Sequence, residues 1–162
     1  MRPIVIDTRE QMPWEFPEWV ETRRHALPFG DYALEGDTGL VIERKNPSDF
    51  LGTFFTNWER FQRELDRATA EFARVEIYIE ALNTDFKSTM DANGDIEPPK
   101  YGSMYITPNA IDSRIMELKE TRPNVAVEFV ESHALGAWLA YKRLEARSNH
   151  LDSLARRLAV LT

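Results

Sequence analysis

Four residues in the first third of the chain have the types and the spacing needed to hydrolyse a phosphodiester bond with a divalent cation. Asp7, Asp31 and Glu43 each stand at or near the end of a strand-like segment, and Lys45 follows two residues after the last of them. Mg²⁺ prefers oxygen ligands, and it is usually held by one or two carboxylates together with water and substrate phosphate. A lysine beside the ion stabilises the charge that develops during hydrolysis. We therefore expect a Mg²⁺ or Mn²⁺ site at the three carboxylates.

The alternation of side chains along a strand places two of these residues together. Residues i and i+2 of a strand point to the same side, so Glu43 and Lys45 face one ion while Arg44 points away. Each motif also has a plain structural explanation. Asp31 is a residue type common in turns, and the segment from Glu43 to Lys45 also fits a solvated strand end.

The segments around these residues predict a β-hairpin. A turn at Gly30 precedes a strand over 32–34, and a glycine-containing loop then returns the chain through a strand over 39–45. Asp31 and Glu43 would then lie on the two arms of one hairpin, close in space although they are separated in sequence.

Helices are predicted after the hairpin. Asn46-Pro47-Ser48-Asp49 is typical of a helix start, because proline fits the first turn and a small polar side chain caps free N–H groups. Asp49 therefore has a capping explanation as well as a place beside the site. Apolar residues at spacings of three and four over 58–72 predict an amphipathic helix. The other face of this helix carries three candidate nucleic-acid contacts, Arg60, Arg63 and Arg67. These arginines also fit an ordinary exposed helix face, because Arg60 and Arg67 each have a glutamate at i+4.

The rest of the chain predicts an α/β domain. The strand over 75–80 directly follows the amphipathic helix, which indicates a crossover to another strand of the same sheet. The other expected elements are strands over 4–6 and 125–130, helices over 108–121, 132–147 and 150–161, and a long loop over 83–105 that covers the site. Three aromatics near the first strand fit either packing or contacts with unpaired bases: Trp14, Phe16 and Trp19.

The composition limits the available chemistry. The 162 residues, 43% of them hydrophobic, suffice for one domain and contain no apolar run of the roughly 20 residues that a membrane-spanning helix requires. The absence of cysteine excludes disulfides and thiolate chemistry, and three histidines make carboxylates the expected metal ligands. The net charge of −7 argues against a polyanionic partner, although the local field over the binding face decides. The N-terminal residues lack the apolar core of a secretory signal, so we expect a cytoplasmic protein.

Three blocks of residues resemble a known family, the XPF-type structure-specific endonucleases. The blocks are Val5-Ile6-Asp7-Thr8-Arg9-Glu10, Gly30-Asp31-Tyr32, and Val41-Ile42-Glu43-Arg44-Lys45 with Asp49 four residues further on. The signature of that family is G-D-Y, a short gap, and then E-R-K-x-x-x-D. The blocks occur in the right order, and the later predicted elements fit the family layout to about Arg147.

The resemblance implies a restriction-endonuclease-like α/β fold, of the PD-(D/E)xK type, in which helices flank a central mixed sheet. It also implies metal-dependent cleavage of DNA at branches, flaps or junctions between single and double strands. Family members commonly dimerise through this domain, so a homodimer is expected. The matching positions are the metal ligands Asp31, Glu43 and Asp7, the catalytic Lys45, and the supporting Arg9, Arg44 and Asp49.

Two features depart from the family. We expect a nuclease domain over 1–147 and a helical extension over 148–162, which is too short for the tandem helix-hairpin-helix module that eukaryotic and archaeal members usually carry. Glu64 stands where the family often has glutamine, and its negative charge would repel a phosphate. This compact, acidic layout favours a bacterial or phage-encoded protein.

Two other functions fit the same motifs. One is a catalytically silent nuclease-fold module kept for DNA binding or dimerisation, whose expected mark is loss of the acidic residues that are all present in this sequence. The other is an enzyme of the same fold that acts on RNA or on unbranched DNA, which only a comparison of substrates separates.

Overall fold

The computed structural model describes residues 1–81, 89–90, 96–97, 100–101, 104–106 and 108–160. Within this part of the chain, six strands form one mixed sheet in the order β10-β5-β4-β3-β1-β2. The strands are β1 (Ile4–Ile6), β2 (Thr22–Arg24), β3 (Tyr32–Leu34), β4 (Val41–Lys45), β5 (Val75–Ile79) and β10 (Val125–Phe129). The helical elements are α1 (Pro47–Leu51), the π-helical turn η1 (Gly52–Thr56), α2 (Trp58–Glu71), α3 (Pro108–Thr121) and α4 (His133–Ala159).

The sheet combines a hairpin with two parallel crossovers. β3 and β4 pair antiparallel, as the turn signals predict, and β4, β5 and β10 pair parallel. Parallel neighbours need a crossover connection, which α2 supplies between β4 and β5 and α3 supplies between β5 and β10. The predicted strands and the helices over 58–72 and 108–121 are therefore confirmed.

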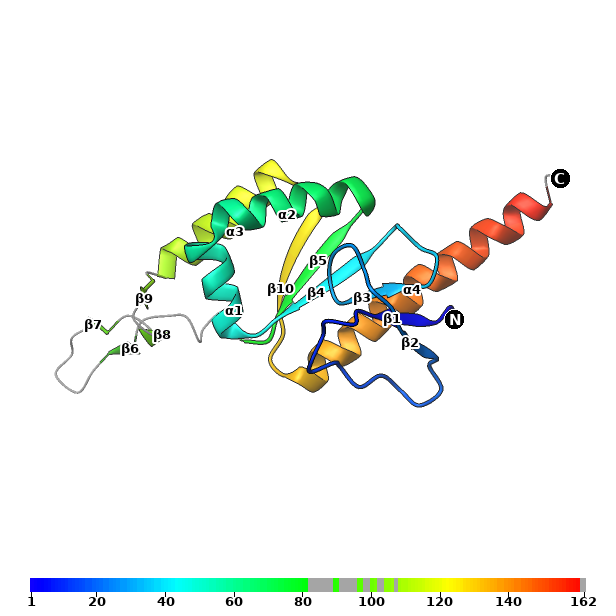
Figure 1. Ribbon diagram of the computed structural model, residues 1–162, viewed down its shortest axis with the longest axis horizontal. Coiled ribbons are helices and arrows are strands. Elements are labelled where there is room, and N and C mark those ends of the chain that lie inside the picture. Colours follow the sequence, from blue (N-terminus) through cyan, green and yellow to red (C-terminus); the bar gives the residue numbers. More distant parts are fainter. Residues whose placement is uncertain (82–88, 91–95, 98–99, 102–103, 107, 161–162) are drawn as a thin grey trace.

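Alternate residues of the central strands pack into two separate cores, one on each face of the sheet. Val41 and Ile77 join the core that α1, η1, α2 and α3 cover, whereas Ile42 and Tyr78 join the core that α4 covers. Figure 1 shows α2 and α3 on one side of the sheet and α4 on the other. Because side chains alternate along a strand, Glu43 in the middle of β4 belongs to the α2 side and the next residue belongs to the α4 side.

The C-terminal part of the chain differs from the prediction of two helices, because α4 is one continuous helix of 27 residues. The polar residues between the two predicted helices do not interrupt it. Ser148 is fully buried, and its hydroxyl accepts a hydrogen bond of 2.9 Å from the Arg2 N–H, so the helix can continue through it. The expected boundary at residue 147 thus lies inside α4. No helix in the described ranges is both long and apolar enough to cross a membrane.

The segment expected as a loop over 83–105 contains short strands. β6 (Thr89–Met90) pairs with β7 (Ile96–Glu97), and β8 (Lys100–Tyr101) pairs with β9 (Met104–Tyr105), both antiparallel. The prediction of an unbroken loop is therefore wrong at these positions. The prediction that this segment covers the site falls largely on residues outside the described ranges.

A glycine sets the turn that leads into β3. Gly30 has a φ of +75°, a left-handed conformation that glycine adopts without steric cost. A Cβ at this position would lie 2.5 Å from Val41 Cγ2 and 3.0 Å from the Ile42 carbonyl oxygen. That same oxygen accepts the Asp31 N–H at 2.9 Å, so it cannot move without breaking the bond that aligns Asp31 with β4.

We predict that Gly30→Ala destabilises the protein more than Gly36→Ala does. Gly36 has nearly the same φ, +70°, but a Cβ there has no atom within 4 Å, so its substitution costs only the left-handed conformation, about 1–2 kcal/mol. Gly30→Ala adds the clash with β4, roughly another 1–3 kcal/mol. Urea unfolding of the two variants measures the difference, and equal losses of stability would contradict the role of close packing.

Candidate active site

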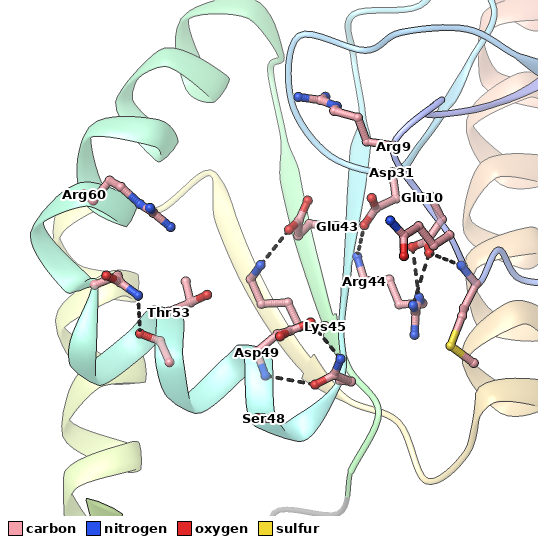
Figure 2. A pocket seen from close by; sticks show the side chains of 15 residues that line it. Arg9, Glu10, Asp31, Glu43, Arg44, Lys45, Ser48, Asp49, Thr53 and Arg60 are labelled. Atoms are coloured by element: carbon pink, nitrogen blue, oxygen red, sulfur yellow. Dashed lines mark hydrogen bonds and ion pairs between the residues drawn. The ribbon is translucent and has the colours of Figure 1, made fainter. Parts of the chain in front are cut away.

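The pairing of β3 with β4 brings the two predicted metal ligands together. The register joins Tyr32 to Ile42 and Ala33 to Val41, and one step further along the hairpin Asp31 lies across from Glu43. Both side chains border a cavity of about 530 Å³ and an adjoining one of about 340 Å³. Figure 2 shows both carboxylates among the side chains that line the larger cavity.

Lys45 lies beside Glu43, as the strand alternation predicts. Its Nζ is 2.7 Å from Glu43 Oε1, and the side chains of both residues are mostly buried, at 12% and 18% exposure. The ammonium group also lies 5.6 Å from the centre of the Phe61 ring of α2, a cation–π distance. Burial and these two contacts hold the lysine head group at the rim of the cavity.

Asp31 is the most perturbed acid of the site. Burial, and then the negative charge of Glu43, raise its pKa to about 7 even though the Arg44 N–H donates to Asp31 Oδ2 at 2.7 Å. Near neutral pH the carboxyl is therefore about half protonated. Two carboxylates that share one lysine leave an excess of negative charge in a half-buried place, which a divalent cation would neutralise.

Asp7 borders the smaller cavity together with Asp31 and Glu43, but other groups bind its carboxylate, so its role as a third metal ligand stays a prediction. It is buried, and its carboxylate accepts hydrogen bonds from the Arg9 side chain, the Arg9 N–H and the Leu27 N–H. Burial raises its pKa, but these bonds outweigh burial and lower it. In the described residues, no group of three or more acidic, histidine or cysteine side chains could hold an ion. Two carboxylates with water and phosphate still satisfy Mg²⁺, so Asp31 and Glu43 fit the ion without Asp7.

Arg9 extends into the site because Asp7 anchors it. Its Nε lies 2.7 Å from Asp7 Oδ1, and one Nη donates to the Leu27 carbonyl at 2.8 Å. The side chain is nevertheless 68% exposed and borders both cavities. Asp7 therefore contributes to the site by holding a guanidinium at its rim.

Arg44 points away from Glu43, as predicted, and it contacts two acids that the sequence did not single out. Its guanidinium donates to Glu10 at 3.0 Å and 3.2 Å and to Glu80 at 2.8 Å, with only 10% of the side chain exposed. Burial lowers the pKa of Arg44, but the two carboxylates outweigh burial and raise it. The one signal for Glu80 in the sequence is a charged residue at the end of the apolar strand β5.

Asp49 borders the larger cavity and does not cap the helix, in contrast to the capping explanation. Its N–H donates to Asn46 Oδ1 at 2.9 Å, and its carboxylate accepts from Asn46 Nδ2 at 2.7 Å. The helix cap is Asn46 itself, the first residue of the predicted start signal. A catalytic role for Asp49 stays a prediction.

The three arginines of α2 that were predicted to contact nucleic acid lie at different places relative to the two cavities. Arg60 borders the larger cavity and Arg67 the smaller one, whereas Arg63 borders neither. Glu64 borders the smaller cavity and pairs with Arg60 at 3.4 Å, in the predicted i,i+4 geometry. This half of the site therefore carries both signs of charge.

The aromatics near β1 divide between packing and exposure. Trp14 is buried and stacks on Tyr32, with ring centres 4.7 Å apart, and Phe16 packs edge-on against the same tyrosine. Trp19 is 77% exposed and lies beside Trp138 of α4 in a separate apolar cavity. Packing accounts for the first two residues.

Comparison with known proteins identifies a family and a fold. The ERCC4 domain family matches residues 6–141, most of the chain. No curated protein shows significant sequence similarity. The structure of XPF from Aeropyrum pernix in complex with DNA has a TM-score of 0.67 and 17% identity, over 92% of this chain and 66% of that one. A second structure of XPF from Aeropyrum pernix has a TM-score of 0.63 and 17% identity, over 90% of this chain and 61% of that one.

The structural matches confirm the predicted restriction-endonuclease-like fold, with a mixed sheet between layers of helices. The chain spans slightly less than two thirds of the length of each of these two proteins. At 17% sequence identity, this structural similarity shows the fold alone.

We predict that Asp31→Asn stabilises the metal-free protein above neutral pH. Because folding raises the pKa of Asp31 from 3.8 to about 7, its contribution to stability is full below about pH 4 and is lost as the pH rises to about 7. The asparagine cannot ionise, and its Oδ1 can still accept the Arg44 N–H. The gain in the free energy of unfolding at pH 8 should be on the order of 2–4 kcal/mol.

Thermal unfolding in EDTA at pH 4.5 and pH 8 measures this effect. Asp152→Asn, on an exposed position of α4, is the control and should change neither melting temperature. A variant of Asp31 that is equally stabilised at both pH values would argue against the raised pKa.

Proposed function

The chain belongs to the ERCC4 domain family, and from that membership we propose that it is a metal-dependent endonuclease that hydrolyses phosphodiester bonds in DNA. The observation that carries the proposal is the pair of carboxylates, Asp31 and Glu43, that meet on adjacent strands beside the ammonium group of Lys45. We extend the proposal to DNA with branches, flaps or junctions between single and double strands. The motif resemblance supports this extension.

The proposed ion is Mg²⁺ or Mn²⁺, held by Asp31 and Glu43 and completed by water and a substrate phosphate. When bound, such an ion polarises the phosphate and lowers the pKa of an attacking water. A cation held there would favour the ionised form of Asp31 and so lower its pKa, which is about 7 without the ion. The chain supplies the oxygens and the lysine on rigid strands, so little reorganisation is needed during the reaction.

Lys45 and the arginines act on the substrate rather than on the ion. The Lys45 ammonium is held at Glu43, where it can stabilise negative charge that develops on the phosphate or orient the attacking water. Arg9 and Arg60 border the same cavity with exposed guanidinium groups suited to phosphate oxygens. Arg67, beside the smaller cavity, extends this basic rim along α2. These side chains offer local positive charge to DNA although the net charge of the chain is −7.

We predict that the protein cuts flap, fork or junction DNA in the presence of Mg²⁺, and that Asp31→Ala and Lys45→Ala each lower the rate at least about 100-fold, because both act on the charge of the transition state. Labelled flap, fork, junction, plain duplex and RNA substrates are incubated with each protein, and the products are separated by size. Asp152→Ala, far from the site in sequence and exposed, is the control.

The outcomes of this comparison separate the candidate functions. Equal cutting by the wild type and both site variants would mean that the activity does not come from this site, and the proposal would be wrong. Tight DNA binding without cleavage in any divalent metal would instead favour the catalytically silent module, and preferential cutting of RNA or plain duplex would replace the branched substrate.

We also predict that Arg67→Ala weakens DNA binding in a salt-dependent way, whereas Arg63→Ala does not. Each phosphate contact that is lost reduces the slope of log K against log salt by about 1. The two arginines lie one turn apart on α2, but only Arg67 borders the site, so they form a matched pair. Binding of fluorescent DNA over a range of NaCl, in Ca²⁺ to prevent cleavage, measures both slopes. Equal slopes for the two variants would mean that DNA does not follow this part of α2.

A further inference from the structure

A buried acid on the far side of the sheet contacts three segments that surround the proposed metal ligands. Glu80 follows β5 directly, and its side chain is only 13% exposed. One oxygen accepts from the Arg44 guanidinium at 2.8 Å, and the other accepts from the Trp14 indole N–H at 2.8 Å and contacts His133 Nδ1 at 2.7 Å. These partners come from β4, from the loop after β1, and from the first residue of α4.

The first connection from Glu80 to the site passes through β4. Its carboxylate holds the Arg44 side chain, and the Arg44 N–H donates to Asp31 Oδ2 at 2.7 Å. Its own N–H donates to the Lys45 carbonyl at 2.9 Å. Glu80 is thus hydrogen-bonded both to Arg44 and to Lys45, the proposed catalytic lysine.

The second connection passes through β3. Trp14, which donates its indole N–H to Glu80, lies flat on Tyr32 with ring centres 4.7 Å apart and an angle of 13° between the rings. The Trp14 N–H also donates to the Tyr32 hydroxyl at 2.9 Å. Tyr32 is the residue after Asp31, so this stack fixes the strand from which Asp31 extends. The tryptophan has no room to shift toward α4, because a Cβ on Gly136 would lie 2.9 Å from its ring.

The stability of the fold alone does not explain why Arg44 is buried between two carboxylates, Glu10 and Glu80. Burying a guanidinium with two carboxylates is costly, and well-packed apolar side chains often stabilise such a place equally well or better. The hydrogen bonds of Glu80 instead reach β4 directly, through Arg44, and the strand after Asp31 indirectly, through Trp14 and Tyr32. The carboxylates of Asp31 and Glu43, which these strands position, repel each other. Contacts that orient the ligands of an ion are typically worth 10- to 100-fold in affinity or activity.

We propose that Glu80 is a positioning residue, which acts through Arg44 and Trp14 to hold Asp31 in the geometry that binds the ion. Glu80 contacts neither the cavity nor the substrate, so its effect is on the affinity of the site for a cation and on turnover, with little effect on DNA affinity. This inference rests on the proposed metal site at Asp31 and Glu43.

Calorimetric titration with Mn²⁺ alone, without DNA, tests the proposal on the full chain. Glu80→Gln should weaken Mn²⁺ binding about 10-fold or more. Glu76→Gln is the matched control, because Glu76 is also buried and lies on β5, the strand that Glu80 follows. It pairs with two arginines, Arg74 and Arg143, that form no ion pair with Asp31 or Glu43 in the described residues. Glu76→Gln should change Mn²⁺ affinity less than about twofold.

Two further variants keep the test decisive if Glu80→Gln loses stability. Trp14→Phe keeps the ring on Tyr32 but removes the indole N–H, and it should weaken Mn²⁺ binding about 2- to 5-fold by removing one of the two connections. Glu80→Asp keeps the charge and should restore part of the affinity. Kinetics on a cleaved DNA substrate should show a lower kcat for Glu80→Gln with KM within about twofold of wild type.

The outcomes distinguish failure of the inference from failure of the site. If Asp31→Ala abolishes Mn²⁺ binding while Glu80→Gln leaves it unchanged, or while Glu76→Gln weakens it equally, the positioning role is overturned and the metal site stands. If Asp31→Ala leaves Mn²⁺ binding intact, the proposed site itself is wrong, and the inference is overturned with it.

Discussion

The repulsion between the carboxylates of Asp31 and Glu43 is the interaction on which the arrangement of this domain depends. Burial, and then the negative charge of Glu43, raise the pKa of Asp31 to about 7. The strands cannot separate to relieve the repulsion, because the register of the hairpin, the Gly30 turn and the Asp31 N–H bond to β4 hold them. The stability lost at this pair is the expected cost of a site prepared for a cation.

The alternation of side chains along β4 divides the work of the site between the two faces of the sheet. Glu43 and Lys45 face the cavity on the α2 side, while Arg44 between them is buried on the α4 side. One short strand therefore carries both the groups suited to chemistry and the anchor that fixes their backbone. Glu10 and Glu80 complete the anchor from two other elements.

Local patterns predicted much of this molecule, and contacts between distant residues account for what they missed. The period of two in β4 placed Glu43 with Lys45, and turn residues placed Asp31 on the partner strand. Asp7 had the right residue type, but Arg9 two positions later occupies its carboxylate. Glu80 lies 36 positions from Arg44, and no periodic signal connects residues so far apart. The break predicted within α4 was wrong because a polar serine can be buried when a backbone N–H satisfies it.

The unbroken course of α4 means that its two ends cannot move independently. At 1.5 Å per residue the helix is a rod about 40 Å long, and Figure 1 shows its C-terminal end extending past the sheet. Ala140 and Leu144 fix the middle of the rod against the sheet, and His133 at its near end touches Glu80. One continuous helix therefore joins the segment beyond the sheet to the residue that contacts Glu80.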